Sequence, residues 1–298
     1  MIDFARSLVL ATRPMSFALS AVPLVVGTAW GVHHSGHFSL GLMLLALASV
    51  TFLHAAANVI NDVGDEISGA DRLNLDCLRP FTGGARLIQK GRISLRAMAL
   101  WGAVLAGAGG GLGITLVMAK GVVPVLFGLV WLGLALAYAL PPFTLASRGL
   151  GELAAGVAFA MPVAVGAWLQ SGTFALEGLL AAAVVGCWTA AILVSHEMPD
   201  ITPDAAAGKR TMVVRLGLKR APSLYLALHA AASALQLALG WRADLPPWTT
   251  VPPVLLMLAA LAAAPLMMHG RAAQASAIRL SFAIHLAGGL TLGIFALL

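Results

Sequence analysis

The sequence predicts an all-α integral membrane protein with nine transmembrane helices, and three observations support that fold class. Hydrophobic residues make up 60% of the 298 residues and charged residues only 10%, whereas about 25% of a soluble domain is charged. Nine apolar stretches are close to the roughly 20 residues that a helix needs to cross a bilayer. They lack the period-two alternation of a membrane β-barrel, so the backbone must satisfy its hydrogen bonds in lipid as helices.

The nine predicted helices follow one another along a single domain, residues 1–298. The first follows Arg6 and Arg13 and has no convincing small-residue cleavage site, so we expect it to be retained as a helix. Glycines at 107–113 lie inside the third helix, where close helix packing explains them better than phosphate binding. The predicted helices lie near residues 15–32, 38–57, 97–118, 121–140, 153–169, 178–194, 221–240, 251–268 and 277–298.

The basic residues indicate how these helices are oriented. In the nine-helix arrangement 16 of the 18 Lys and Arg residues fall on one side, and only Lys120 and Arg242 fall on the other. Basic residues accumulate on the cytoplasmic side of membrane proteins. We therefore expect a multi-pass protein of the inner (plasma) membrane with a cytoplasmic N-terminus and its C-terminus on the far side. The membrane also explains the net charge of +6 without nucleic acid as a partner.

Two cytoplasmic connections, residues 58–96 and 195–220, are long, and we expect both to be Asp-rich loops. They hold eleven of the basic residues and eight of the twelve acidic ones. A loop that only confers solubility has no reason to concentrate acids in a chain so poor in them, so we expect the chemistry here. The eight acidic residues are Asp62, Asp65, Glu66, Asp71, Asp76, Glu197, Asp200 and Asp204.

The first connection begins with a polar ladder. Asn58, Asn61 or Asp62, and Asp65 share one face if the preceding helix continues through them, and Asp71 follows. Their oxygen atoms suit Mg²⁺, which binds through one or two carboxylates together with substrate phosphates.

The second connection repeats the pattern. Asp200 and Asp204 are again four residues apart, and Lys209 and Arg210 follow directly, supplying donors for phosphate oxygens. A single carboxylate in a loop is usually only solvated, but two matched clusters at a membrane edge rarely have a purely structural role. Two Asp-rich clusters on one membrane face, each followed by basic residues, predict a site for a metal-bridged diphosphate.

Five stretches, in order, resemble the UbiA superfamily of intramembrane prenyltransferases, and in particular its menaquinone branch, the 1,4-dihydroxy-2-naphthoate polyprenyltransferases. The resemblance covers nearly the whole chain. One such stretch would be weak evidence, but five in the right order are specific. The similar stretches are residues 11–14 with 20–28, the array Asn61-Asp62-x-x-Asp65 with Gly69 and Asp71, residues 81–91, residues 138–152, and residues 200–211.

The resemblance implies nine helices enclosing a central cavity and a Mg²⁺-dependent transfer of a polyprenyl group from its diphosphate to an aromatic acceptor. The favoured acceptor is 1,4-dihydroxy-2-naphthoate, in the biosynthesis of menaquinone or a related isoprenoid quinone. The implied partners are a polyprenyl diphosphate, the aromatic acceptor and the lipid bilayer. The expected metal ligands are Asp62, Asp65, Asp200 and Asp204; the expected diphosphate-binding residues are Arg72, Arg86, Lys90, Arg148, Lys209 and Arg210; and the expected catalytic residues are Asn58, Asn61, Asp62, Asp65, Asp71, Tyr138, Asp200 and Asp204.

Within the catalytic set, individual roles follow from chemistry. Asn58, Asn61 and Tyr138 are candidates for positioning the acceptor, and Asp65 or Asp71 for assisting its deprotonation. The allylic cation must be shielded from water, which an intramembrane cavity provides.

Residues 196–199 differ from the menaquinone branch, which often carries Asn-Asn-x-Arg where this chain has His-Glu-Met-Pro. Another acceptor, or a terpene cyclase that ionises the same substrate, therefore stays open. A multi-pass transporter is the alternative of another class, although transporter sites lie near the bilayer midplane and these acids lie at the cytoplasmic ends. A CDP-alcohol phosphotransferase would compress its aspartates into one segment.

Overall fold

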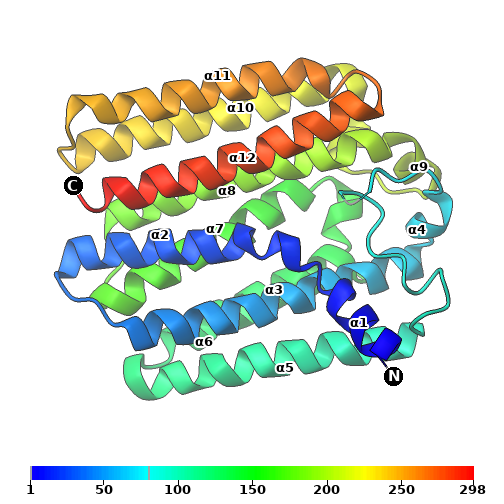
Figure 1. The fold of residues 1–298 in the computed structure, drawn as a ribbon, viewed down its shortest axis with the longest axis horizontal. Coiled ribbons are helices and arrows are strands. Elements are labelled where there is room, and N and C mark those ends of the chain that lie inside the picture. Colours follow the sequence, from blue (N-terminus) through cyan, green and yellow to red (C-terminus); the bar gives the residue numbers. More distant parts are fainter. Residues whose placement is uncertain (1, 80) are drawn as a thin grey trace.

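Each of the nine predicted apolar stretches coincides with a helix in the computed structural model, which describes residues 2–79 and 81–298 (Figure 1). These helices are α2 (Ala18–Ser35), α3 (Leu40–Ser68), α5 (Leu95–Lys120), α6 (Val123–Ala139), α7 (Gly151–Ser171), α8 (Leu176–Glu197), α10 (Met212–Arg242), α11 (Val251–Leu266) and α12 (Arg271–Phe295). Shorter elements connect them: α1 (Ile2–Ala11), η1 (Pro14–Ser16), α4 (Ala70–Leu73), η2 (Leu145–Arg148), η3 (Met198–Asp200), α9 (Ile201–Ala206) and η4 (Pro247–Thr250).

The lengths of these helices set how many can cross a membrane. Within the described residues, seven helices are long and apolar enough to do so. An eighth span forms if the N-terminal segment and α2, which meet at a bend of 51°, are counted together, while the apolar helix α6 has only 17 residues. The all-α class with many apolar spans is confirmed, and the count of nine crossings stays a prediction.

Polar residues mark the ends of several helices. The hydroxyls of Ser39, Ser94 and Thr211 accept hydrogen bonds from the first turns of α3, α5 and α10, as N-cap residues do. Gly69 ends α3 with a φ of 77°, in the left-handed region that glycine adopts at helix ends. Gly217, with a φ of 72°, interrupts α10 near its start. The predicted apolar helix begins only at residue 221 because Arg215, Lys219 and Arg220 precede it.

The helices lie side by side along the long axis of the molecule (Figure 1). The most extensive contacts join α2 to α7, α3 to α5, α7 to α8, and α8 to α10. The short helices α1, α4 and α9 gather at one end of the bundle, whereas the C-terminus lies at the opposite end. This arrangement brings the two acid-rich segments together.

Small residues allow close contacts between helices. A Cβ atom on Gly27 of α2 would lie 2.0 Å from the carbonyl oxygen of Val163 on α7, so the two backbones touch, as is common between membrane helices. The packing prediction for residues 107–113 holds only in part. Gly109 packs against Leu53 of α3, but a Cβ on Gly110 would meet open space, and Gly110 lines a cavity.

The predicted Asp-rich loops 58–96 and 195–220 are loops only in part. Helix α3 continues to Ser68 and is followed by α4, so the first cluster lies on helices and irregular chain begins only at Asn74. Helix α8 ends at Glu197 and is followed at once by η3 and α9, which carry the second cluster. The apolar residues used to place the helix ends stop where the chain leaves the apolar part of the bundle. The helical backbone itself continues into the polar segments.

Candidate active site

A polar cavity of about 120 Å³ lies at the bundle end that holds α4 and α9. It contains residues of both acid clusters, as the sequence predicts. Its lining residues are Arg13, Asn61, Asp65, Ala70, Asp71, Asn74, Phe81, Thr82, Gly83, Gly84, Tyr138, Ala146, Leu193, His196, Glu197, Asp200, Asp204, Lys209 and Thr211.

Lys209 joins the two acid clusters. Its Nζ atom lies 2.6 Å from Oδ1 of Asp65 in the first cluster and 3.8 Å from Oδ1 of Asp204 in the second. Burial by itself would lower the pKa of the ammonium group, but Asp65 and Asp204 more than offset burial, and the pKa of Lys209 is raised. A fixed positive charge therefore lies between the carboxylates in the middle of the cavity.

The end of α3 presents the first cluster. Nδ2 of Asn61 donates a hydrogen bond to Oδ2 of Asp65 one turn later, at 3.0 Å, and both side chains line the cavity. Asn58 does not line it. Its Nδ2 donates to the carbonyl of Thr12 (2.9 Å) and to the hydroxyl of Ser16 (3.0 Å). Asn58 thus ties the N-terminal segment to α3, and its contacts do not support its predicted role in positioning an acceptor.

Arg13 lines the cavity and forms an ion pair with the buried carboxylate of Asp62, which does not line it although it was an expected metal ligand. Oδ2 of Asp62 has no hydrogen-bond partner within the described residues. Gly84 packs against this pair with a φ of 59°, and a Cβ atom there would lie 2.6 Å from Oδ1 of Asp62. Any residue larger than glycine would collide with the pair, which links the glycine-rich stretch predicted to belong to the site with α3.

The second cluster is anchored through Asp200. Its Oδ1 accepts a hydrogen bond from the hydroxyl of Thr82 at 3.0 Å. Thr82 belongs to the stretch 81–91, so this contact holds that stretch over the cavity.

Asp71 lies on α4 and lines the cavity, where only 5% of the residue is exposed. Its Oδ2 accepts a hydrogen bond from Nε2 of Gln89 at 3.2 Å. Burial raises the pKa of Asp71 to about 7, and the nearby carboxylates of Asp65 and Asp62 add to that rise.

Of the six basic residues expected to bind diphosphate, only Lys209 lines the cavity. Arg72 pairs with Glu66, and Arg86 donates to the carbonyl of Asn74. The reason is geometric, because proximity in sequence to an acid motif does not fix the direction in which a long side chain extends. Lys90, Arg148 and Arg210 are exposed, and Arg148 donates to the carbonyl of Pro142.

Six polar or charged residues that line the cavity had not been predicted as site residues. Nothing in the sequence singled them out, because each lies beside residues with a more recognisable pattern, such as an apolar stretch, a glycine pair or an aspartate. Tyr138, which had been predicted, does line the cavity. The six are Arg13, Asn74, Thr82, His196, Glu197 and Thr211.

The donor atoms fit Mg²⁺ better than a softer metal. Within residues 2–79 and 81–298, no three His, Cys, Asp or Glu side chains lie close enough together to form a complete metal site. The carboxylates of Asp65, Asp71, Asp200 and Asp204 nevertheless all face one cavity. Oxygen ligands from one or two carboxylates, completed by substrate phosphates and water, are the usual Mg²⁺ arrangement. These residues therefore fit a Mg²⁺ ion that binds together with a diphosphate.

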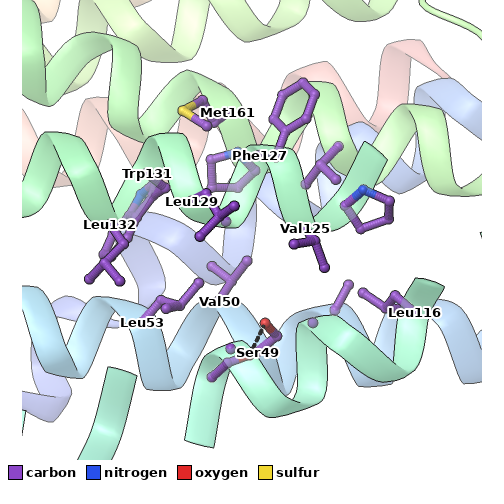
Figure 2. Close-up of a pocket in the computed structure, with 18 of the residues that line it drawn as sticks. Ser49, Val50, Leu53, Leu116, Val125, Phe127, Leu129, Trp131, Leu132 and Met161 are labelled. Atoms are coloured by element: carbon purple, nitrogen blue, oxygen red, sulfur yellow. Dashed lines mark hydrogen bonds between the residues drawn. The ribbon is translucent and has the colours of Figure 1, made fainter. Parts of the chain in front are cut away.

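A second cavity, of about 160 Å³, is apolar and lies between α3, α5, α6 and α7 (Figure 2). Leu53 of α3 and Leu132 of α6 line it, and the hydroxyl of Ser49 is satisfied by donating to the carbonyl of Gly109 at 2.7 Å. At 1.5 Å per residue, Leu132 is ~9 Å along α6 from Tyr138 in the polar cavity. The apolar cavity thus lies further along the same helices, toward the opposite end of the bundle.

A model of the UbiA prenyltransferase family matches residues 20–287. The chain is 32% identical over 215 residues to a 1,4-dihydroxy-2-naphthoate octaprenyltransferase of Escherichia coli (strain K12), covering 69% of this chain and 67% of that protein. It is 31% identical to a 2-carboxy-1,4-naphthoquinone phytyltransferase of Synechocystis, covering 84% and 78%. A 1,4-dihydroxy-2-naphthoate octaprenyltransferase of Mycobacterium tuberculosis is 32% identical, with 85% and 83% covered.

Solved structures agree in fold. A UbiA homolog from Aeropyrum pernix K1 superimposes with a TM-score of 0.72 at 24% identity, covering 95% of this chain and 98% of that one. A UbiA homolog from Archaeoglobus fulgidus bound to DMAPP and Mg²⁺ gives a TM-score of 0.69 at 18% identity, covering 93% and 98%. With its fold, its paired acid clusters and a family match over most of its length, the chain belongs to the UbiA prenyltransferase family.

Proposed function

We propose that this protein is a Mg²⁺-dependent prenyltransferase that moves a polyprenyl group from its diphosphate to 1,4-dihydroxy-2-naphthoate, in the biosynthesis of menaquinone or a related isoprenoid quinone. One observation carries the proposal. Asp65 and Asp204, from acid clusters far apart in sequence, lie on either side of Lys209 in a single cavity. The naphthoate and naphthoquinone prenyltransferases among the relatives support the choice of acceptor.

The polar cavity suits the diphosphate. Lys209 and Arg13 supply fixed positive charge that is already in place before the allylic carbon–oxygen bond breaks, and such preorganised charge stabilises a developing anion. Bound Mg²⁺ would neutralise further charge on the leaving diphosphate. Asp65, Asp200 and Asp204 are the residues that would hold it, with Asp71 beside them.

The apolar cavity suits the prenyl chain. The residues that line it are almost entirely hydrocarbon. They offer the isoprenoid chain surroundings like those of the bilayer, whereas exposure to water would cost ~0.8 kcal/mol for each CH₂ group. A chain whose diphosphate lies beside Lys209 would extend along α3 and α6 into this cavity (Figure 2). Burial of the reacting carbon between the two cavities keeps the allylic cation away from water.

Aromatic side chains at the cavity suit an aromatic acceptor. Tyr138, Phe81 and His196 line it, and the ring of His196 contacts those of Phe81 and Phe282, with centroids 6.4 Å and 5.3 Å away. Such rings offer faces and edges against which an acceptor ring can pack.

We further propose that the protein resides in the inner membrane with the polar cavity facing the cytoplasm. The distribution of basic residues, 16 on the side of the acid clusters against two on the other, supports this orientation. Helix α1 lies at the same end of the bundle as α4 and α9, and the C-terminus lies at the opposite end, which is consistent with this orientation (Figure 1).

The direct test uses purified protein in detergent, a polyprenyl diphosphate and Mg²⁺, with products identified by mass spectrometry. With 1,4-dihydroxy-2-naphthoate we expect a prenylated naphthol product and release of diphosphate. Transfer only to a different aromatic acceptor would refute the naphthoate assignment, and formation of a cyclic isoprenoid without any acceptor would identify a terpene cyclase instead. The absence of diphosphate release under every condition would refute the proposal as a whole.

A further inference from the structure

His196, the last residue but one of α8, contributes an imidazole ring to the wall of the polar cavity. Its Nε2 atom is buried and has no hydrogen-bond partner within residues 2–79 and 81–298. A buried nitrogen without a partner costs free energy that an apolar side chain of similar shape would avoid. Packing alone therefore does not account for a histidine at this position.

The ring of His196 is held by aromatic contacts with two other segments. Its centroid lies 6.4 Å from that of Phe81 and 5.3 Å from that of Phe282 on α12, with the rings tilted by 47° and 44°. Phe81 is itself held, because the guanidinium group of Arg279 lies over its ring, 5.6 Å from the centroid. The imidazole is thus in place before a ligand arrives, so a hydrogen bond to it costs little additional ordering.

The charged groups of the same cavity have different surroundings. Asn61 and Lys209 both contact Asp65, at 3.0 Å and 2.6 Å, so a ligand that reaches them must share or replace these contacts. Such groups suit a diphosphate and its metal ion. His196 instead combines an unpaired nitrogen with aromatic neighbours. These surroundings suit an aromatic ring that carries a hydroxyl group.

We propose that Nε2 of His196 forms a hydrogen bond with a ring hydroxyl of the aromatic acceptor and so positions the ring beside the allylic carbon, an assignment that rests on the proposed function. An imidazole nitrogen accepts the hydroxyl hydrogen in one tautomer and donates to the hydroxyl oxygen in the other, so the hydroxyl has a partner in both. An acceptor without that hydroxyl leaves Nε2 unpaired, and the site therefore discriminates against it.

The test is a cycle that combines a change in the protein with a change in the acceptor. Calorimetry with Mg²⁺ and an unreactive prenyl diphosphate analogue measures the binding of 1,4-dihydroxy-2-naphthoate, 1-hydroxy-2-naphthoate and 4-hydroxy-2-naphthoate. We expect His196→Phe, which keeps an aromatic ring, to bind the dihydroxy acceptor about 10-fold more weakly than wild type. The analogue without the contacted hydroxyl should bind wild type about 10-fold more weakly. It should lose no further affinity in His196→Phe, because both changes remove the same hydrogen bond.

Two further variants separate this hydrogen bond from a structural role. His196→Asn, whose amide can pair with a hydroxyl, should keep more affinity for the dihydroxy acceptor than His196→Phe. His285→Phe is the matched control. His285 is also buried, with an Nδ1 atom that has no partner among the described residues, but it lines neither cavity. It should bind the acceptor as wild type does, and all three variants should bind a prenyl diphosphate normally.

Four results would overturn the inference: wild-type affinity for the dihydroxy acceptor in a folded His196→Phe protein, losses that add fully for both analogues, a His196→Asn protein as weak as His196→Phe, or impaired prenyl diphosphate binding in His196→Phe. If His196→Phe does not fold, His196→Leu takes its place in the cycle. A wild-type protein that binds the prenyl diphosphate but neither binds nor prenylates a naphthoate refutes the proposed function instead.

Discussion

Replacing Asp65 by Asn is expected to slow prenyl transfer by ~10²-fold or more. The substitution keeps the size of the side chain and removes its charge. In the structure Oδ1 of Asp65 lies 2.6 Å from Nζ of Lys209, and these two side chains are only 18% and 16% exposed. Solvent therefore screens the pair little, and the lost charge is felt throughout the cavity.

The magnitude follows from that geometry. Two unit charges 2.6 Å apart attract by about 6 kcal/mol at an effective dielectric constant of ~20. Desolvation offsets part of this gross term. The loss of one preorganised group in an active site costs about 2.7–4 kcal/mol, or ~10²–10³-fold in turnover. This cost is smaller than the gross attraction between Asp65 and Lys209.

The same reasoning predicts how Asp65→Asn combines with Asp200→Asn. Both carboxylates are proposed to act on one diphosphate, so the double variant should lose much less than the product of the two single losses, as expected for residues that act as a unit. Binding of a non-ionisable prenyl compound to the apolar cavity should be unchanged.

The assay is single-turnover transfer in detergent at saturating Mg²⁺, with the folded state of each variant checked by its thermal unfolding midpoint. Glu177→Gln is the control, because Glu177 lies in the first turn of α8, where it pairs with Arg242 at 3.3 Å, and does not line the cavity. A folded Asp65→Asn protein with wild-type turnover would refute the electrostatic argument, and strictly multiplicative losses in the double variant would show that the two clusters act independently.

Three other predictions address the metal, the topology and the prenyl chain. A chelator should abolish transfer and added Mg²⁺ should restore it, because in residues 2–79 and 81–298 no three potential metal ligands form a preformed cage that would retain the ion; undiminished turnover in the chelator would contradict this. In a cysteine-free background, Ser68→Cys and Ala206→Cys should be protected from an impermeant thiol reagent in intact cells, and labelling of either from outside would reverse the orientation. Gly110→Leu should fill part of the apolar cavity and raise the KM for long-chain prenyl diphosphates severalfold more than for short ones. Gly107→Leu should have no such effect, because a side chain on Gly107 also meets open space but Gly107 does not line the cavity. Equal effects of the two variants would argue against this location for the prenyl chain.

The pairing of the acid clusters could be predicted from sequence, but the surroundings of the clusters could not. Asp65, Asp204 and Lys209 carry the prediction, because spacing of carboxylates on a helix face and the basic residue that follows are local properties. Asn58 shares that helix face with Asp65 but lies seven residues earlier, where Thr12 and Ser16 occupy its amide. The periodicity of the sequence shows which face of the helix a residue lies on. It does not show which distant segment packs against that residue at its position along the helix.

The partners of the basic residues near the site could not be predicted from the sequence either. Arg13 lies 49 positions before Asp62, its partner, and nothing in the local pattern connects the two. Arg72 is next to Asp71 in sequence, yet it extends to Glu66 at the surface of the protein. The long flexible stems of Arg and Lys reach several ångströms in any direction, so their partners are chosen by the tertiary fold.

The position of Arg13 has a practical consequence for handling the protein. Its guanidinium group forms part of the wall of the polar cavity, and the helix before it is held to the bundle by a hydrogen bond from Nε1 of Trp101 to the carbonyl of Leu8 at 3.1 Å. A truncation that removes Arg13 and the helix before it therefore takes away part of the cavity wall, even though it spares every residue of the two acid clusters. An affinity tag or fluorescent fusion is better placed after Leu298, at the opposite end of the bundle, where it cannot crowd substrate entry (Figure 1).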